Sequence, residues 1–386
     1  THGSYITVAT CNLNQWALDF DGNAKRVLKS CLIARDVHGA SYRLGPELEL
    51  CGYGCEDHFL EHDTFYHCWE SLAWLIDSGA TDGILCDFGM PVLHCGARYN
   101  CRVLCKDRKV LLIRPKIAMA DGGNYRESRY FTAYRTPGHG HPFGGTPSDE
   151  HSLPRHLPAF QEQSTAPFGI QFLQFKDGST IGCESCEELW TPQAPHIDMA
   201  LAGVEIVGNG SGSHHELRKL NQRIDLIVSA TRKCGGIYLY ANQRGGDGGR
   251  LYYDGSAVIV CNGELLAQAS QFSVSDVEVV AATIDLDDVR SYRASIPSFG
   301  IQAARVTEDS SRSCIVCQDY FVGQFGRPSP QSRQCLDGAL PDFVPSKPVQ
   351  LMVHTEEEEC CLGPACWMWD YLRRSGASGF FLPLSG

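Results

Sequence analysis

Residues 204–241 read VEIVGNGSGSHHELRKLNQRIDLIVSATRKCGGIYLYA. The apolar run Val204–Gly208 predicts a strand, Glu216–Lys233 predicts a helix, and the β-rich run Gly236–Ala241 predicts a second strand. A strand, a helix and a strand in this order form one unit of an α/β fold, in which the helix covers a face of the sheet. This stretch therefore predicts a layered α/β domain.

The same alternation extends over the first 290 residues. The Asn262-Gly263 pair between apolar runs is typical of a β-hairpin turn, and the polar turn Lys106–Lys109 joins a second hairpin. The other expected strands are Tyr5–Leu13, Tyr42–Leu48, Ile84–Leu93, Asn100–Cys105, Val110–Arg114, Thr180–Leu189 and Val277–Ile284. The other expected helices are Asp21–His38, Phe59–Asp77 and Pro195–Ala202.

Two segments interrupt this pattern. Thr136–Pro167 is rich in His, Pro, Gly and Ser, and we expect a long surface loop with one short helix there. Ser298–Pro348 is rich in Ser, Pro and Arg, which is typical of a linker between domains. Beyond it, Leu362–Ser375 predicts a helix and Phe380–Leu384 predicts a strand.

Composition narrows the class of protein. The chain has 386 residues with 33 basic and 45 acidic side chains, a net charge of -12, which argues against a nucleic-acid binder. No apolar run approaches the roughly 18 residues of a membrane helix. Several of the 19 cysteines lie inside apolar runs. This usage predicts buried, reduced thiols and a cytoplasmic location.

Three residues with catalytic side chains each follow an apolar, strand-like run: Glu47, Lys116 and Cys186. Taken singly, each has a simpler interpretation: an acid at a helix N-terminus, a solvated lysine, and one structural cysteine among many. The ends of strands in one sheet lie close together, so the three side chains can meet. A thiolate at neutral pH needs a nearby base or cation, which this set supplies.

The sequence also contains two CxxC motifs, Cys183–Cys186 and Cys314–Cys317. Paired CxxC motifs can bind zinc. These two lie far apart in dissimilar surroundings, and His139-Gly140-His141 is an equally weak signal. We therefore expect no metal site.

The set Glu47, Lys116 and Cys186 resembles the Glu–Lys–Cys triad of the carbon–nitrogen hydrolase (nitrilase) superfamily. More closely, the chain is similar to the N-terminal glutaminase part of glutamine-dependent NAD synthetases. The stretches that carry the resemblance are VATCNLNQWALDFDGN, YRLGPELELCGYGCEDH, YNCRVL, LLIRPK, GNYRESRYFT, CEELWTPQAPHIDMALAGVEI, NGSGSHHELRK, GGIYLYANQRGGDGGRLYYDGSAVI, LGPACWMWDYLRRS and FFLPLSG.

The resemblance implies a fold and a division into domains. Residues 1–295 are expected to form a four-layer αββα sandwich, the glutaminase domain. Residues 296–355 are expected to be an irregular linker. Residues 356–386 are expected to be the truncated start of an α/β synthetase domain of the ATP-pyrophosphatase type, because the ATP-binding sequence SGGxDS is not completed.

The resemblance also implies hydrolysis of L-glutamine to glutamate and ammonia through a cysteine thioester. Glu47 is the expected general base, Cys186 the nucleophile and Lys116 the oxyanion-stabilising cation, with Glu127 supporting the lysine. The residues expected to bind the substrate are Tyr125, Glu187, Ser213 and Lys219. Lys219 departs from the pattern, because bacterial relatives carry Arg there and lysine cannot grip a carboxylate in bidentate fashion.

In the complete enzyme the ammonia serves the amidation of nicotinic acid adenine dinucleotide, which needs ATP and Mg²⁺, whereas the glutaminase needs no cofactor. The resemblance further implies a homo-oligomer and a synthetase domain as partner. Two alternatives stay open. One is a free-standing amidase that acts on another small amide, and the other is a non-catalytic assembly protein that keeps the fold.

Overall fold

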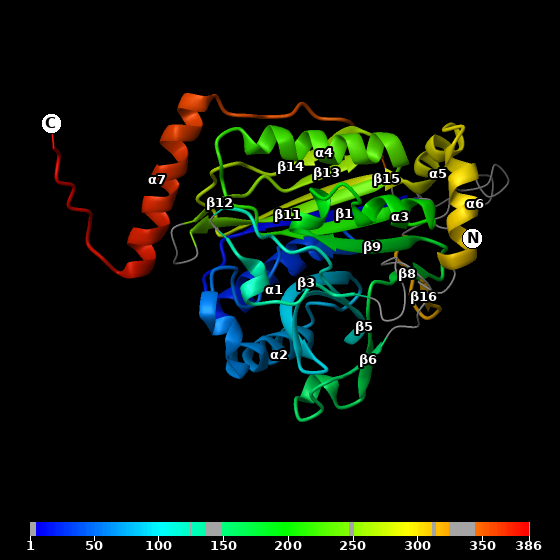
Figure 1. The fold of residues 1–386 in the computed structure, drawn as a ribbon, viewed down its shortest axis with the longest axis horizontal. Helices are drawn as coiled ribbons and strands as arrows, with labels where there is room; N and C mark the ends of the chain where they lie inside the picture. Colours follow the sequence, from blue (N-terminus) through cyan, green and yellow to red (C-terminus); the bar gives the residue numbers. More distant parts are fainter. Residues whose placement is uncertain are drawn as a thin grey trace, which may run out of the picture.

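The computed structural model describes residues 5–123, 125–135, 149–246, 251–310, 314–323 and 344–385. Their sixteen strands form one sheet, whose main path runs β16-β8-β9-β10-β11-β1-β2-β3-β4-β5-β7-β6 (Figure 1). The strands are β1 (Tyr5–Leu13), β2 (Tyr42–Leu44), β3 (Leu85–His94), β4 (Ala97–Lys106), β5 (Lys109–Pro115), β6 (Asp149–Ser152), β7 (Thr165–Phe168), β8 (Phe172–Phe175), β9 (Thr180–Ser185), β10 (Ile206–Ser211), β11 (Ile237–Gly246), β12 (Tyr252–Asp254), β13 (Val258–Cys261), β14 (Glu264–Gln268), β15 (Val277–Asp285) and β16 (Cys314–Cys317).

The sheet curls so that its two halves face each other. One core cluster, made almost entirely of strand residues, lies between them, because successive side chains of a strand point to opposite faces. It joins Leu85 and Leu104 of one half to Ile181, Ile206 and Leu239 of the other. The outward faces of the same strands pack against helices.

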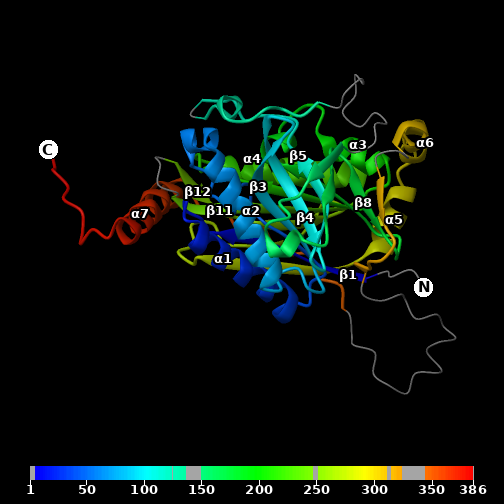
Figure 2. The same ribbon diagram turned by 90° about the horizontal axis from the view of Figure 1, so that it is seen from below.

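Helices cover both outer faces of this double sheet. α4 (Lys219–Cys234) lies above the strands in Figure 1, and α3 (Pro195–Leu201) packs against α4 and β9. α1 (Phe20–Leu32) and α2 (His62–Asp77) lie in front of them when the molecule is seen from below (Figure 2). The expected four-layer αββα sandwich is confirmed.

Both expected hairpins are present, and several expected boundaries are wrong. β13 and β14 meet at Asn262, and β4 pairs antiparallel with β5. The strand expected over Tyr42–Leu48 ends at Leu44, because Gly45 and Pro46 turn the chain toward Glu47. The strand expected over Thr180–Leu189 ends at Ser185.

The segment expected as a loop over Thr136–Pro167 is more ordered than predicted where it is described. It contains β6, the short 3₁₀ helix η4 (Pro158–Phe160) and the start of β7. The part over residues 136–148 lies outside the described residues.

The interval 296–355 is not irregular throughout, contrary to expectation. α6 (Phe299–Ser310) follows α5 (Leu286–Ala294), and β16 adds a parallel strand beside β8 at the sheet edge. Spacing gave little warning of β16, because four residues are too few to show a period.

The C-terminal helix is longer than expected. α7 (Glu356–Ser375) begins after Thr355, whose side chain forms a capping box with Glu358. The acidic run therefore occupies the first helical turn, where its negative charges interact favourably with the positive end of the helix dipole. The strand expected over Phe380–Leu384 is absent: these residues are described without regular structure.

α7 packs against the end of β11 through a buried ion pair. Asp370 accepts a hydrogen bond from Arg244 at 3.0 Å, and both side chains are fully buried. Figure 1 shows α7 beside the ends of the sheet strands. The expected helical segment is thus joined to the sheet by a charged contact.

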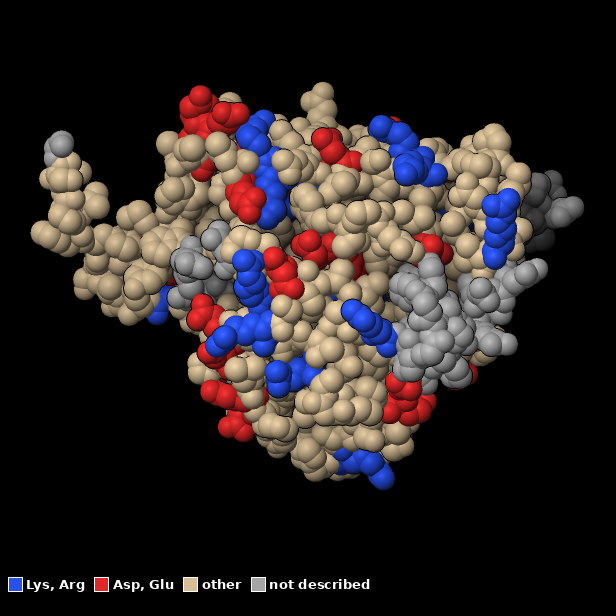
Figure 3. Space-filling view, in the orientation of Figure 1, with Lys and Arg blue, Asp and Glu red and all other residues tan. Residues whose placement is uncertain are grey.

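Two surface observations bear on binding partners. On the face seen in Figure 3, Lys and Arg side chains are interspersed with Asp and Glu and form no single basic area. Within the described part of the chain, no helix combines the length and the apolar character needed to cross a bilayer.

Candidate active site

Cys186 lies at the point where β9 turns into a short 3₁₀ helix, η5 (Cys186–Leu189). Ser185 and Glu188 form a capping box that closes this turn. Cys186 itself has a φ of 39°, in the left-handed region that non-glycine residues rarely adopt. A residue held in this conformation marks a site where the surrounding structure fixes the backbone.

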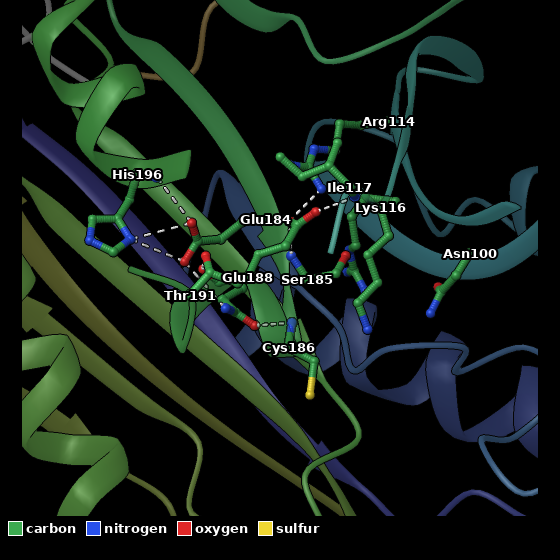
Figure 4. Close-up of polar contacts among 12 residues, drawn as sticks. Asn100, Arg114, Lys116, Ile117, Glu184, Ser185, Cys186, Glu188, Thr191 and His196 are labelled. Carbon is green, nitrogen blue, oxygen red and sulfur yellow. Dashed lines mark hydrogen bonds and ion pairs between the residues drawn. The ribbon is translucent and has the colours of Figure 1, made fainter. Parts of the chain in front are cut away.

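Glu188 anchors the turn from behind. Its carboxylate accepts hydrogen bonds from Arg114 at 2.5 Å and from the backbone N–H groups of Ile117 and Ser185 at 2.6 and 2.8 Å (Figure 4). Arg114 and Ile117 flank Lys116. One buried carboxylate therefore ties the Cys186 turn to the segment that carries the lysine.

Glu47, Lys116 and Glu127 form a buried cluster held together by Asn100. The Lys116 ammonium lies 2.7 Å from Oε1 of Glu47 and 2.7 Å from Oε2 of Glu127. The Asn100 amide nitrogen donates to the same Oε1 of Glu47 at 2.7 Å and to the other oxygen of Glu127, Oε1, at 2.8 Å. Two carboxylates thus share one cation and one amide, away from solvent.

Gly212 links this cluster to the cysteine. Its backbone N–H donates to Oε2 of Glu47 at 3.1 Å and also contacts the Cys186 thiol. The main-chain carbonyl of Glu47 accepts a hydrogen bond from Gln243 at 2.8 Å, which fixes the loop that carries the carboxylate. Glu47 and Cys186 therefore meet across the Gly212 amide.

The electrostatics follow from burial and neighbouring charges. Burial opposes the charged form of Lys116, but Glu127 and Glu47 outweigh it and raise its pKa well above the ordinary value, so the lysine is cationic. Burial, with Glu47 adding to it, raises the pKa of the Cys186 thiol to about 12. The free thiol is therefore protonated at neutral pH and needs a base to become a nucleophile.

A cavity of about 390 Å³ opens above Cys186, within the size range of small-molecule sites. Five of the eight residues expected from the sequence line it: Tyr125, Cys186, Glu187, Ser213 and Lys219. The other three, Glu47, Lys116 and Glu127, lie buried beneath it. The structure thus brings all eight expected residues to one place.

The polar residues of the cavity differ in how they are held. Burial raises the pKa of Glu187, which is half-buried. The hydroxyl of Tyr125 is buried and has no hydrogen-bond partner among the described residues. The Lys219 ammonium lies 3.5 Å from the Glu216 carboxylate, and both side chains line the cavity.

Arg223, which the sequence analysis did not single out, supports the cavity from below. It is fully buried and donates to the Ser213 hydroxyl at 3.1 Å and to Asp254 at 3.2 Å. It lies one turn after Lys219 on α4. The four-residue spacing of Lys219 and Arg223 places them on one face of the helix, and this spacing could have pointed to Arg223 from the sequence.

Asn100 and Tyr53 were also missed. Asn100 is a buried amide within β4, and it has Arg98 and Arg102 as its neighbours on the same strand face, so the sequence does not set it apart. Tyr53 lines the cavity and packs on Tyr125 with ring centroids 5.0 Å apart. Tyr53 lies in a loop, so no helical or strand periodicity in the sequence points to it.

No group of His, Cys, Asp and Glu side chains suited to a metal ion occurs in the described ranges. Cys183 is buried in the inner core rather than at the cavity, so it does not share a site with Cys186.

A family model described as carbon-nitrogen hydrolase matches residues 7–294. The chain belongs to the carbon–nitrogen hydrolase family. The matched part contains all eight expected site residues and most of the curled sheet.

Curated relatives of this carbon–nitrogen hydrolase are glutamine-dependent NAD(+) synthetases. The one from Saccharomyces cerevisiae is 53% identical, and the alignment covers 99% of this chain and 50% of the relative. The one from Homo sapiens is 52% identical over 100% of this chain and 51% of the relative. The chain thus spans about half the length of the curated relatives it matches.

Solved structures agree on the fold of this carbon–nitrogen hydrolase. A glutamine-dependent NAD(+) synthetase from Cytophaga hutchinsonii superposes with a TM-score of 0.63 at 27% identity, covering 73% of this chain and 43% of that one. An amidase from Nesterenkonia sp. superposes with a TM-score of 0.53 at 18% identity, covering 75% of this chain and 95% of that one.

Proposed function

We propose that this chain hydrolyses L-glutamine to glutamate and ammonia through a thioester on Cys186. The observation that carries the proposal is the buried cluster of Glu47, Lys116 and Glu127 beneath a cavity that Cys186 lines. The relatives that are 52–53% identical to this chain are named as glutamine-dependent enzymes, which supports glutamine as the substrate.

Glu47 acts as the general base of the first step. It takes the proton of the Cys186 thiol as sulfur attacks the carboxamide carbon, because the raised pKa of the thiol leaves little free thiolate. The negative charge that develops on the carbonyl oxygen is stabilised by Lys116 and by the backbone N–H of Glu187. Glu127 and Asn100 keep the lysine charged and in place.

Collapse of the tetrahedral intermediate breaks the carbon–nitrogen bond. Protonated Glu47 returns its proton to the leaving nitrogen, which departs as ammonia and leaves a thioester. Glu47 then takes a proton from water as the water attacks the thioester carbon. The carbon–sulfur bond breaks, the thiol regains a proton, and glutamate is released, so one glutamine and one water give one glutamate and one ammonia.

The cavity offers a partner for each end of the substrate. Glu187 suits the α-ammonium group, and Lys219 suits the α-carboxylate as a point charge. Tyr125 and Ser213 contribute hydroxyl groups, and the Tyr125 hydroxyl is free to bond a ligand. Arg223 holds Ser213 in position.

We infer that the ammonia serves the amidation of nicotinic acid adenine dinucleotide in the whole protein, with ATP and Mg²⁺. This rests on the names of the relatives, of which the chain spans about half. The proposed division is a glutaminase domain over 1–295, a connecting segment over 296–355 and the start of a synthetase domain over 356–386.

A homo-oligomer and a synthetase domain as partner belong to the same proposal. So does a cytoplasmic, reducing location, which the cysteines support. All those that the structure describes are free thiols, and most are buried.

The test is ammonia release from L-glutamine by the chain and by two matched variants. Cys186→Ala removes the nucleophile and is expected to abolish turnover. Cys183→Ala removes a thiol three residues earlier on β9, buried in the inner core, and is expected to keep most of it. Equal loss in both variants would overturn the assignment, and turnover of other small amides but not glutamine would favour a free-standing amidase.

A further inference from the structure

The backbone N–H of Cys186 is turned away from the cavity. It donates to Oδ1 of Asn209, a buried residue of the neighbouring strand β10, at 2.8 Å. This bond holds the left-handed backbone of Cys186, whose φ is 39°. Because a non-glycine residue avoids this conformation, the position of the sulfur depends on the group that accepts the N–H.

The orientation of the Asn209 amide is set on all sides. Its oxygen also accepts a hydrogen bond from the Ser211 hydroxyl at 2.8 Å. Its nitrogen donates to the Tyr238 hydroxyl at 2.9 Å and to Oε1 of Glu184 at 3.4 Å. An amide turned the other way would point its nitrogen at the N–H of Cys186, so these bonds decide which atom faces the cysteine.

Glu184 completes the arrangement as a buried carboxylate. It accepts a hydrogen bond from the Tyr238 hydroxyl, and another from the backbone N–H of His196 at 3.1 Å (Figure 4). Burial would raise the pKa of Glu184, but His196 and Tyr238 outweigh it and hold that pKa below the ordinary value. Glu184 is therefore an acceptor at neutral pH, so the Tyr238 hydroxyl proton points to it and the tyrosine oxygen is left to accept from Asn209.

We propose that Asn209, Tyr238 and Glu184 are positioning residues for the nucleophile, acting on Cys186 through its backbone N–H. This rests on the proposed glutaminase chemistry. None of the three lines the cavity, so none touches the substrate. They belong to three adjacent parallel strands, β9, β10 and β11. Glu184 lies directly opposite Asn209, and Tyr238 lies two residues before Tyr240, which is the partner of Asn209 on β11.

The arrangement has a consequence for the oxyanion. Since the N–H of Cys186 is occupied by Asn209, it is not available to the carbonyl oxygen of the substrate. The oxyanion must then be bound by the next amide, that of Glu187, together with Lys116. The three residues therefore orient the Cys186 sulfur. They also give the two successive backbone N–H groups different roles: that of Cys186 is a structural donor, and that of Glu187 is the donor to the oxyanion.

The experiment compares Tyr238→Phe with Tyr252→Phe in the full chain. Tyr238→Phe removes the hydroxyl that orients Asn209. Tyr252→Phe removes another buried hydroxyl, one that lies outside the cavity and next to Cys366 of α7. The readouts are kcat and KM for glutamine, the rate of Cys186 alkylation by iodoacetamide followed by peptide mass analysis, and the thermal midpoint.

Tyr238→Phe is expected to lower kcat and the Cys186 alkylation rate by about tenfold each, the effect of one lost hydrogen bond, with KM within about twofold of the wild-type value. Tyr252→Phe is expected to leave all three unchanged. Asn209→Ala is expected to lower both rates by about a hundredfold. If this variant does not fold, Tyr238→Phe still decides.

An unchanged alkylation rate in folded Tyr238→Phe overturns the proposal, as does a loss confined to KM. Alkylation does not depend on glutamine. A chain that is inactive on glutamine but shows slower alkylation in Tyr238→Phe would contradict the glutaminase and keep the positioning role. The opposite pattern would keep the glutaminase and reject the positioning role.

Discussion

The ammonium nitrogen of Lys116 lies 2.7 Å from Oε1 of Glu47, and neither side chain is exposed to solvent. An ion pair in this setting is sensitive to the loss of either partner, because the remaining charge stays buried. The cation also stands beside a second carboxylate, that of Glu127.

Lys116→Met is therefore expected to be severe. Removing the cation leaves two carboxylates in contact through Asn100 alone, which should lower the free energy of unfolding by about 3–5 kcal/mol. Loss of the oxyanion donor should lower kcat by at least about 10²–10³. Lys109→Met, at the partly exposed start of β5, the strand that leads to Lys116, is the control and is expected to change stability by less than about 1 kcal/mol. Ammonia release and urea unfolding measure both effects.

Asn100→Leu tests the amide that joins the two carboxylates. Leucine has a similar volume but cannot donate, so Glu47 and Glu127 each lose a hydrogen bond of 2.7 and 2.8 Å. We expect a loss of about 1–3 kcal/mol in unfolding free energy and at least a tenfold drop in kcat. A variant as active as the wild type would show that Lys116 alone organises the carboxylates.

Cys186 reactivity should depend on pH in an unusual range. The pKa raised to about 12 keeps the thiol protonated where an ordinary cysteine has already ionised. Without substrate, alkylation of Cys186 by iodoacetamide should therefore keep rising by about tenfold per pH unit from pH 8 to 10. Alkylation of the exposed Cys360 in the same digest supplies the comparison. A plateau for Cys186 below pH 9 would contradict the burial argument.

Gly212→Ala tests the close approach of a loop to the cavity wall. A Cβ at this position would lie 2.2 Å from Cδ2 of Tyr53, which is too close for either group to stay in place. We expect a loss of about 1–3 kcal/mol in stability and a rise in KM, since Tyr53 packs on Tyr125. Gly300→Ala, where the added methyl group meets nothing within 4 Å, is the matched control.

His151 predicts acid sensitivity far from the cavity. Burial, and secondarily His94, lower its pKa to about 4, and its ring nitrogen lies 3.1 Å from that of His94. A lowered pKa means that the stabilising contribution is complete above pH 6.5 and is lost as the pH falls through 4. His151→Phe should lose less stability over this range, by up to about 3 kcal/mol in unfolding free energy. Parallel curves for both proteins would reject the assignment.

How far the sequence predicts the structure depends on the length of the pattern. The long apolar segments that form α2 and β1 are located to within a few residues, because many apolar positions mark them. β16 and β6 are not, because four residues of backbone pairing at a sheet edge need no distinctive side chains. Gly45-Pro46 was passed over as a strand end although Pro46 has no N–H to donate.

The candidate site divides in the same way. Glu47, Lys116 and Cys186 stand at strand ends, where sequence reasoning looks for chemistry, and the structure places them together. Asn100 and Asn209 lie in the interior of strands, and Tyr238 is the second residue of β11. Their importance lies in which neighbouring strand each one faces, and that depends on sheet order, which local sequence does not contain.

The contact between α7 and β11 couples the position of the helix to the loop that carries Glu47. Asp370 grips Arg244, and the preceding residue on the same strand, Gln243, holds the carbonyl of Glu47 at 2.8 Å. Because the backbone of a β-strand is nearly inextensible, a tilt of α7 would displace Arg244 and Gln243 together, and with them the loop that carries Glu47. A displacement of α7 would therefore reach the main chain of Glu47 through two contacts, Asp370 with Arg244 and Gln243 with Glu47.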